Sequence, residues 1–475
     1  MSGSADRVRR AEEAELAKQR LRAVYSELLA RTPEDRMQPR LEPVRRVCEL
    51  LGEPQRAYPV IHLTGTNGKT STARMIERLL REHNLRTGRF TSPHLQDVTE
   101  RISVDGRPLS AAKFVEVYED VAPYVAMVDG ELRQADQVPI TYFEMLAVMA
   151  FAAFADAPVD VAVVEVGLGG TWDATNVADA TVAVITPISL DHTRMLGDTV
   201  AEIAGEKAGI ITEGGFVVMA QQPVEAAEVL LAKAVEDRAT VAREGMEFGV
   251  TSRQVAVGGQ VVTVQGLAGT YTDVFLPLHG EHQAHNMAVA IAAVEAFIGN
   301  GDQPLSADVV QEAMADMTSP GRLELVRQSP AVIVDAAHNP AGAQALVAAM
   351  EEAFNFTYLV GVVGVLADKD AGAILDVLEP LLDEVVITRS TSPRAVPVGV
   401  LAEEAEDVFG EDRVHVEERL DDAIVAAADR AEAEGGQTGG VLVTGSVTVA
   451  GEARVLLRAP AVDEQERFVQ REERL

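Results

Sequence analysis

The sequence of 475 residues contains a single cysteine, Cys48. One cysteine excludes a disulfide within the chain and excludes metal sites built from several thiolates. Long apolar runs are also missing, since the longest extends from Met145 to Ala155 and ends at Asp156. That run is too short to span a bilayer and predicts a buried helix. The first twenty residues are polar, so we expect no secretory signal and a cytoplasmic location.

Basic residues are scarce relative to acidic ones. The chain has 41 Lys and Arg against 74 Asp and Glu, for a formal net charge of -33. A surface this negative repels phosphate backbones and anionic lipids, so we expect neither a nucleic-acid partner nor a membrane partner. Hydrophobic residues make up 47% and charged residues 24%, which is typical of a globular protein.

Apolar runs that alternate with helical stretches predict an α/β protein. The run YPVIHL at residues 58–63 leads into the loop GTNGKT and then into the helical stretch STARMIERLLREH. Further β-branched runs at 159–170, 180–188 and 216–220 are typical of strands buried in a parallel sheet. Residues 250–278 alternate between apolar and polar with glycine turns, which indicates a small antiparallel insertion.

A second α/β unit follows the segment MTSPGRLELV, whose Pro and Gly mark a domain boundary. Its four predicted strands lie in AVIVDAAHNP, TYLVGVVGVL, EVVITRS and GGVLVTGS. We therefore predict a P-loop-type, mostly parallel ATP-binding domain at 1–318 with the antiparallel insertion, and a Rossmann-like α/β domain at 319–475. Residues 1–40 are predicted to form a charged helical extension.

The strongest local signal is the loop from Gly65 to Thr70, between a strand and a helix. Backbone N–H groups of such a loop approach phosphates closely, and the helix N-terminus favours negative charge. Lys69 would contact the β- and γ-phosphates, and the Thr70 hydroxyl would reach Mg²⁺. Leu63 stands where the standard motif has glycine, so an ordinary glycine turn is the alternative. The flanking strand and helix favour the phosphate loop.

Other polar residues follow predicted strands. Glu165 ends a buried strand, where a carboxylate suits Mg²⁺, although a capping or salt-bridged Glu would also fit. His192 follows the next strand, and by itself a structural histidine is the more common case. Lys207 lies on a predicted helix, where spacing alone gives it no role. Asp335 and His338 occupy a ligand-facing loop, which an Asx-type turn would also explain. These residues alone indicate a nucleotide-dependent enzyme of undefined reaction.

Several segments together resemble the folylpolyglutamate synthase/dihydrofolate synthase family of the Mur ligase superfamily. In chain order they are HLTGTNGKTST, FTSPHLQDVTERISVDG, TYFEMLAVMAF, VVEVGLGGTWDATNV, ITPISLDHTRMLG, AGEKAGII, HGEHQAHNMAVA, SPGRLELV and VDAAHNPAGA. The loop GTNGKT is shared by Mur-type ligases in general. The combination of SPHL with ERI, and the GLGG…DATN run, point to the folate branch.

The resemblance implies ATP-dependent amide formation by a monomeric enzyme. A substrate carboxylate would attack the γ-phosphate of ATP to give an acyl phosphate, and the amine of L-glutamate would then displace phosphate. The acceptors would be dihydropteroate, reduced folates or both, and the DATN run with its Asp173 favours both. Metal and cationic charge are needed on the transferring phosphoryl group.

The resemblance also implies roles for individual residues. Contacts to ATP would come from Gly65, Thr66, Asn67, Gly68, Lys69, Thr70, Asn286, Arg322 and Asp335. Mg²⁺ would be held by Ser92, Glu165 and His192. Lys207 would be carbamylated, which turns a cation into an anionic oxygen donor, and would act in catalysis with Lys69 and His338. The pterin site would be lined by Thr141, Tyr142, Phe143, Glu144, Trp172, Asp173 and Ala174.

Two alternatives remain, a related ligase and a protein of another class. A peptidoglycan-type Mur ligase, which adds an amino acid to a UDP-linked precursor, shares GTNGKT, but no separate UDP-binding domain is evident before the loop. A GTPase-type switch protein would need an Asn-Lys-x-Asp motif after a strand. The nearest segment, at residues 367–370, reads ADKD and lacks the Asn. The charged extension and the departure at Thr171 and Trp172, where many relatives have Arg and Leu, have no assigned role.

Overall fold

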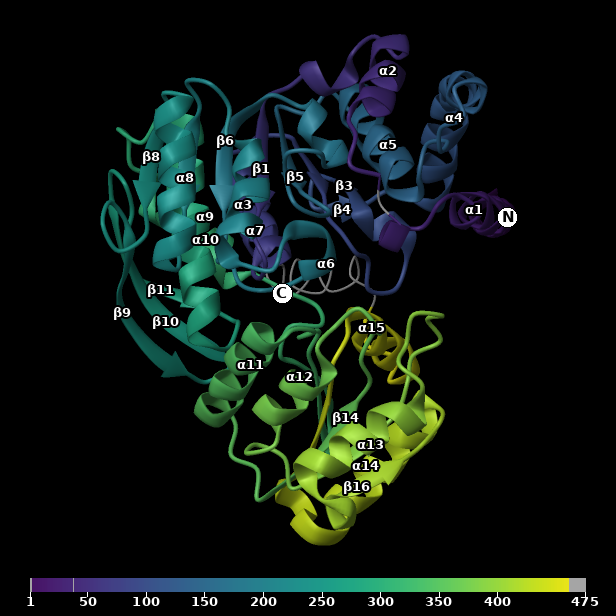
Figure 1. The fold of residues 1–475 in the computed structure, drawn as a ribbon, viewed down its shortest axis with the longest axis vertical. Helices are drawn as coiled ribbons and strands as arrows, with labels where there is room; N and C mark the ends of the chain where they lie inside the picture. Colours follow the sequence, from purple (N-terminus) through teal and green to yellow (C-terminus); the bar gives the residue numbers. More distant parts are fainter. Residues whose placement is uncertain (1, 37, 461–475) are drawn as a thin grey trace.

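Two sheets, one of eight strands and one of six, organise the molecule into two α/β halves that lie one above the other (Figure 1). The structure is a computed structural model and describes residues 2–36 and 38–460. All strands of the eight-stranded sheet precede residue 319, and all strands of the six-stranded sheet follow it. The predicted fold class is confirmed, and the boundary at 318/319 remains our proposal.

The first sheet has the strand order β4-β3-β2-β5-β1-β6-β7-β8. Its strands are β1 (Val60–Thr64), β2 (Thr87–Phe90), β3 (Ile102–Val104), β4 (Arg107–Pro108), β5 (Val161–Glu165), β6 (Ala180–Ile185), β7 (Phe216–Met219) and β8 (Thr240–Arg243). Strand β3 is antiparallel to β2 and β4, and β1 is parallel to both β5 and β6. The carboxyl ends of β1, β5 and β6 therefore meet at one edge, where α/β folds bind ligands.

Helices cover both faces of this sheet. They are α1 (Ser2–Leu29), α2 (Glu42–Leu50), α3 (Lys69–Glu82), α4 (Ala111–Gln134), α5 (Tyr142–Asp156), α6 (Thr193–Leu196), α7 (Val200–Lys207), α8 (Val224–Glu236), α9 (Glu281–Gly299) and α10 (Ala307–Ala315). Alternate residues of β5 point to opposite faces. Ala162 and Val164 pack in the cluster of α4 and α5, whereas Val161 and Val163 pack in the cluster of α3 and α9.

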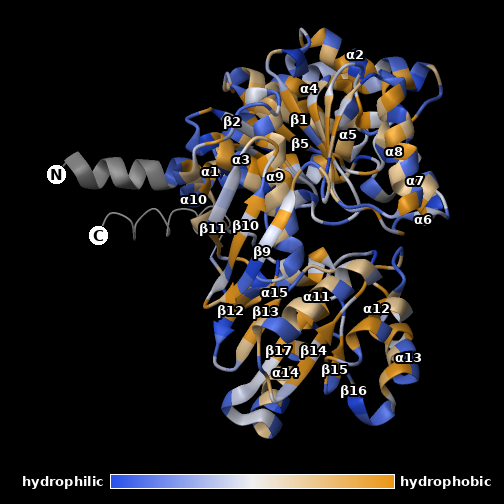
Figure 2. Ribbon diagram, turned by 90° about the vertical axis from the view of Figure 1, so that its left-hand side faces the viewer, coloured by the Kyte–Doolittle hydropathy of each residue, from blue (hydrophilic) through white to orange (hydrophobic). Residues whose placement is uncertain are grey.

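Apolar residues accordingly gather inside both halves (Figure 2). The run from Met145 to Ala155 forms α5, and most of its side chains are buried, as predicted. Among residues 2–36 and 38–460, no helix is long and apolar enough to cross a membrane. The charged extension forms α1, which packs on α4 through Leu21, Val24 and Leu28.

The predicted antiparallel insertion is the three-stranded sheet β9 (Gly249–Ala256), β10 (Gly259–Gln265) and β11 (Thr270–Leu276). Val262, Val264 and Val274 belong to the same apolar cluster as α9 and α10. The insertion thus extends the helical layer of the first half rather than forming a core of its own.

The second sheet has the order β12-β13-β17-β14-β15-β16. Its strands are β12 (Glu324–Gln328), β13 (Ala331–Val334), β14 (Tyr358–Val363), β15 (Glu384–Ile387), β16 (Val414–Val416) and β17 (Gly439–Thr444). Its helices are α11 (Pro340–Ala353), α12 (Ala371–Leu378), α13 (Val398–Phe409), α14 (Leu420–Gly435) and α15 (Val447–Leu456). The four predicted strands are β13, β14, β15 and β17, and the edge strands β12 and β16 were not predicted.

Short 3₁₀ helices connect several of these elements. They are η1 (Glu34–Arg36), η2 (Pro54–Arg56), η3 (Val98–Arg101), η4 (Ala174–Val177), η5 (Ala208–Ile210), η6 (Glu411–Arg413) and η7 (Gly436–Thr438). Of these, η1 and η3 border the cavity between the halves.

Candidate active site

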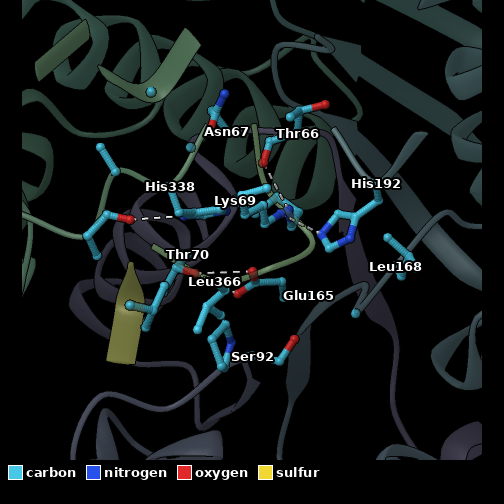
Figure 3. Close-up of a pocket in the computed structure, with 18 of the residues that line it drawn as sticks. Thr66, Asn67, Lys69, Thr70, Ser92, Glu165, Leu168, His192, His338 and Leu366 are labelled. Carbon is cyan, nitrogen blue, oxygen red and sulfur yellow. Dashed lines mark hydrogen bonds between the residues drawn. The ribbon is translucent and has the colours of Figure 1, made fainter. Parts of the chain in front are cut away.

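A cavity of about 1290 Å³ lies where the two halves meet. The phosphate loop, the residues after β5 and β6, and loops of the second half all line it. Figure 3 shows the side chains that converge there, including Lys69, Thr70, Glu165, His192 and His338. The carboxyl edge of the first sheet thus forms one wall of the cavity, as the order of its strands requires.

The two glycines of the phosphate loop permit its close packing. Gly65 has φ +144° and Gly68 has φ +86°. A Cβ atom on Gly65 would lie 1.9 Å from Thr186 Oγ1, and one on Gly68 would lie 2.6 Å from Asn286 Oδ1. Only glycine fits both positions, so the loop's backbone stays open to a ligand.

Lys69 begins α3 and folds back over this loop. Its Nζ donates hydrogen bonds to the carbonyl oxygens of Gly65 and Thr66, each at 3.1 Å. Burial lowers the pKa of Lys69, while Glu165 and Asp191 oppose that shift. A cation held in this position faces the cavity (Figure 3) and is suited to phosphate oxygens.

Glu165 ends β5 with its carboxylate against the start of α3. The Thr70 hydroxyl donates to Glu165 Oε2 at 3.0 Å, and Glu165 is 1% exposed. Burial raises the pKa of Glu165 to about 6, although Lys69 and Thr70 act against it. A carboxylate this buried is stabilised by a nearby cation. Ser92 lines the same cavity, and its backbone hydrogen-bonds to Glu165.

His192 lies in the loop after β6. Its backbone is left-handed, with φ +50°, and its Nε2 lies 3.2 Å from Lys369 Nζ. Burial and Lys369 lower the pKa of His192 to about 4, so the ring is neutral at neutral pH, as a metal ligand requires. Within the described residues no three His, Cys, Asp or Glu side chains form a metal cluster. The oxygens of Ser92 and Glu165 are the kind of donor that Mg²⁺ prefers, whereas His192 Nε2 faces the Lys369 ammonium, so the three-residue metal site stays a prediction.

Lys207 ends α7 next to the phosphate loop. It is 4% exposed, and its Nζ donates to the carbonyl oxygen of Gly65 at 2.8 Å. Burial lowers the pKa of Lys207 to about 7, and Lys69 adds to the effect. A substantial share of the side chain is therefore an uncharged amine at neutral pH. Lys207 thus lies against the phosphate loop but is not among the residues that line the cavity, and its catalytic role stays a prediction.

The second half contributes Arg322, Asp335 and His338, and all three line the cavity with Asn286. Asp335 accepts from the backbone N–H of Leu323 at 2.8 Å. Burial raises the pKa of Asp335, and Arg322 opposes this. His338 Nδ1 donates to the carbonyl oxygen of Ala336 at 2.9 Å, which leaves Nε2 as the acceptor. The two sets of predicted ATP-binding residues therefore share one cavity.

Sequence reasoning missed a polar contact that joins the halves. Lys369 Nζ donates to Asp191 Oδ1 at 2.6 Å, and Asn339 Nδ2 donates to Asp191 Oδ2 at 3.0 Å. Asn339 also exchanges side-chain hydrogen bonds of 3.1 and 3.2 Å with Asn67 of the phosphate loop. Burial would raise the pKa of Asp191, but His192, Lys369 and His338 outweigh it and hold the pKa well below its usual range.

The sequence holds only weak signals for this contact. Asp191 directly precedes His192, and Lys369 lies in the segment ADKD, which resembles an incomplete guanine-reading motif. Nothing local indicates that residues separated by 178 positions meet.

The predicted pterin residues divide into two groups. Tyr142 and Phe143 line the cavity. Thr141 and Glu144 instead form the capping box of α5, and Arg40 Nε donates to Glu144 Oε1 at 3.0 Å. Because its carboxylate is used in these contacts, Glu144 fixes the start of α5 and thereby the position of Tyr142 and Phe143.

Asp173 is fully buried and accepts hydrogen bonds from the backbone of its own loop. Its carboxylate accepts from the backbone N–H groups of Leu168 and Thr175, both at 2.9 Å. Burial raises the pKa of Asp173, and these hydrogen bonds oppose the rise. Trp172, Asp173 and Ala174 do not line the cavity, whereas Leu168 does. Asp173 thus holds Leu168, which is a residue of the cavity wall, and the assignment of the three residues to the pterin site stays a prediction.

Replacing Asp173 by alanine should therefore destabilise the protein. Two buried N–H groups would lose their acceptor, at a cost of roughly 1–3 kcal/mol each in the free energy of unfolding. Denaturant unfolding of Asp173→Ala measures the loss, with Asp179→Ala, an exposed site in the same loop region, as the control. Unchanged stability combined with a raised KM for the acceptor alone would instead assign Asp173 to direct substrate binding.

Comparison with known proteins decides the family. Residues 63–294 match the Mur ligase middle domain, and residues 321–447 match the Mur ligase, glutamate ligase domain. Dihydrofolate synthase/folylpolyglutamate synthase of Mycobacterium tuberculosis (strain ATCC 25618 / H37Rv) is 53% identical over 445 residues, which cover 90% of this chain and 91% of that protein. The chain belongs to the dihydrofolate synthase/folylpolyglutamate synthase family.

Other members of this family agree. The Escherichia coli (strain K12) protein of the same name is 33% identical over 86% of this chain and 88% of its own length. The solved structure of Mycobacterium tuberculosis folylpolyglutamate synthase complexed with ADP has a TM-score of 0.90 at 52% identity, covering 94% of this chain and 99% of that one. The resemblance inferred from the sequence segments is confirmed, and the chain is an ATP-dependent ligase of the Mur type.

Proposed function

We propose that this ligase adds L-glutamate to a pteroate-type carboxylic acid, either dihydropteroate or a reduced folate, and forms ADP and phosphate. The observation that carries the proposal is the convergence of the phosphate loop, Lys69 and the Thr70–Glu165 pair on one cavity with residues of the second half. Two relatives, 53% and 33% identical to this chain, are named dihydrofolate synthase/folylpolyglutamate synthase. The two activities in that name favour two acceptors for this chain as well.

The reaction would proceed in two displacements. A carboxylate oxygen of the acceptor attacks the γ-phosphorus, the bond to the ADP oxygen breaks, and an acyl phosphate forms. The glutamate nitrogen then attacks the acyl carbon, phosphate departs, and the nitrogen loses a proton. Lys69 and the loop N–H groups would stabilise charge on the phosphoryl oxygens. His338, with Nε2 free to accept, is positioned between the halves and would receive or orient the glutamate amine.

Ser92, Glu165 and His192 would hold Mg²⁺, and Mg²⁺ would neutralise charge on the transferring phosphoryl group. Lys207 would react as the neutral amine with carbon dioxide, forming an N–C bond and releasing a proton to give a carbamate. The carbamate would place negative charge beside Gly65. The unmodified ammonium of Lys207 would instead repel a metal ion there. We also propose a cytoplasmic monomer.

Glu165→Gln should raise the Mg²⁺ concentration needed for half-maximal turnover by roughly tenfold or more, because the amide keeps the shape but not the charge. The parent enzyme should itself need more Mg²⁺ below pH 6, since the pKa of Glu165 is about 6 and its protonated form binds no cation. Turnover against Mg²⁺ at pH 5.5 and 7.5 measures both effects, with the exposed Glu225→Gln as the control. Identical Mg²⁺ curves for parent and variant would remove Glu165 from the metal site.

Phosphate release tests the reaction class. The ligase should release phosphate from ATP only when an acceptor acid and L-glutamate are both present. Phosphate release from nucleotide alone, at the same rate, would instead support a switch-type NTPase. Use of a UDP-linked acceptor in place of a pteroate acid would support the peptidoglycan-type alternative.

A further inference from the structure

Arg454 is a charged side chain with no solvent exposure, and it lies on helix α15 at the border between the two halves (Figure 1). Its Nε and NH2 donate to the two carboxylate oxygens of Glu324, at 2.7 and 3.2 Å. Its NH1 donates to Gln96 Oε1 at 2.7 Å, and NH2 also donates to the carbonyl oxygen of Pro460 at 2.9 Å. Gln96 belongs to the first half and is separated from Arg454 by 358 positions. One guanidinium therefore joins a loop of the first half to a strand of the second half.

Gln96 lies in the loop between β2 and η3, which also carries Ser92. The Glu100 carboxylate accepts from the backbone N–H groups of Leu95 and Gln96, at 2.8 and 3.0 Å, so this part of the loop is held as one unit. Ser92 lines the cavity, and its backbone hydrogen-bonds to Glu165. Through this loop, the position of Gln96 is linked to the position of two proposed metal ligands.

The same loop packs closely on the second half beside Arg454. Leu95 packs against an apolar cluster that includes residues of β13, β17 and α15. A Cβ atom on Gly451 of α15 would lie 2.0 Å from the carbonyl oxygen of Leu95, and one on Gly321 would lie 3.0 Å from Leu95 Cδ2. Glycine at position 451 thus lets the backbone of the loop approach α15 closely enough for Gln96 to reach Arg454.

Glu324 connects the guanidinium to the turn that carries Arg322. Glu324 Oε2 accepts from the backbone N–H of Gly321 at 2.7 Å, and Arg322 NH1 donates to the carbonyl oxygen of Gly321 at 3.1 Å. Arg322 lines the cavity as a predicted ATP contact. Because Arg454 holds both oxygens of Glu324, the turn at 321–324 is held against α15.

We propose that Arg454 is a positioning residue, which fixes the loop of Ser92 relative to the turn of Arg322 and so aligns the two halves for phosphoryl transfer. Arg454, Gln96 and Glu324 do not line the cavity, so they would act through other residues. A misplacement of about 1 Å caused far from the chemistry can cost roughly a hundredfold in rate. The proposal rests on the proposed function, which gives Ser92 and Arg322 their roles.

Gln96 is the residue to change, because it is partly exposed and its loss leaves the Arg454–Glu324 pair intact. Gln96→Ala should lower kcat for ligation roughly tenfold, while the KM values for ATP and L-glutamate change less than about threefold. Gln96→Glu keeps an oxygen that accepts from Arg454 and should recover at least about half of the parent kcat. Gln137→Ala, at an exposed site between α4 and α5, is the control and should match the parent enzyme.

Hydrogen exchange gives a readout that does not depend on catalysis. In Gln96→Ala the backbone amides of residues 92–97 and of residues 321–324 should both exchange at least about threefold faster than in the parent, because Leu95 covers Gly321. Amides of β14, which lies inside the second sheet, should exchange at the parent rate. Faster exchange confined to residues 92–97 would show that the loop and the turn are not linked, and would overturn the proposal.

The kinetic results decide in the same way. An unchanged kcat in Gln96→Ala would overturn the proposal, and so would a loss of kcat that Gln96→Glu does not recover. Thermal unfolding reports whether Gln96→Ala folds. If it does not, Gln96→Met keeps the length of the side chain without the oxygen and should show the same loss of kcat, and a parent-like kcat in that variant would overturn the proposal.

The two proposals fail in different ways. If the parent enzyme ligates glutamate to neither acceptor, the proposed function is wrong, and hydrogen exchange still tests whether Arg454 links the loop to the turn. If the parent ligates normally and Gln96→Ala ligates equally well, only the positioning role of Arg454 is wrong.

Discussion

Lys69→Ala is expected to reduce ligation by roughly a thousandfold while the protein remains folded. Lys69 Nζ lies over the phosphate loop, within 3.1 Å of two loop carbonyl oxygens, and faces the cavity. The substitution removes a cation that lies beside the loop, faces the cavity and would stabilise the developing phosphoryl charge. Initial rates of ADP formation with acceptor and glutamate present measure the effect.

Lys113→Ala is the matched control, because Lys113 lies on α4 and pairs with Glu116 and Asp156 outside the cavity. Circular dichroism and thermal unfolding should be similar for both variants and the parent enzyme. Ligation by Lys69→Ala at the parent rate would show that the GTNGKT loop does not act on the phosphates.

Lys207→Ala should lose most activity, by roughly a hundredfold or more, if Lys207 functions as a carbamate. Lys207→Arg should fail as well, because guanidinium keeps its positive charge and cannot become an anion. Short carboxylic acids should partly restore Lys207→Ala by occupying the space of the lost carbamate. Carbamylation needs the neutral amine, and with a pKa of about 7 its fraction rises as the pH passes from 6 to 8.

The adduct itself can be observed. Incubation with ¹³C-bicarbonate should give a carbamate NMR signal in the parent enzyme that is absent from Lys207→Ala and retained in Lys113→Ala. A crystal structure of the active, metal-bound enzyme should show extra density on Lys207 Nζ. A well-ordered, unmodified Lys207 in such a crystal would rule out the carbamate.

Much of the fold and part of the candidate site can be predicted from local sequence patterns. Buried parallel strands such as β5 consist almost entirely of apolar residues, so the sequence shows them clearly. The loop between β1 and α3 requires glycine at positions 65 and 68, and this requirement is also visible in the sequence. The edge strands β12 and β16 were not predicted because most of their residues are partly or fully exposed, which leaves no continuous apolar run in the sequence.

Contacts between segments far apart in the chain could not be predicted from local sequence patterns. The bonds among Asp191, Asn339 and Lys369 join loops of different sheets, and each residue alone has an ordinary turn or surface explanation. The resemblance assigned Thr141, Glu144 and Asp173 to the pterin site, but a motif does not reveal whether a carboxylate faces a ligand or its own backbone. In this fold Asp173 and Glu144 use their oxygens within the protein.

Incorporation of labelled L-glutamate tests the central claim most directly. With ATP and Mg²⁺ present, the purified protein should transfer label to dihydropteroate and to a reduced folate, and each glutamate incorporated should accompany one ADP and one phosphate. Omission of ATP or the acceptor should abolish the product. Absence of labelled product with both acceptors, from a folded protein that binds ADP, would contradict the account.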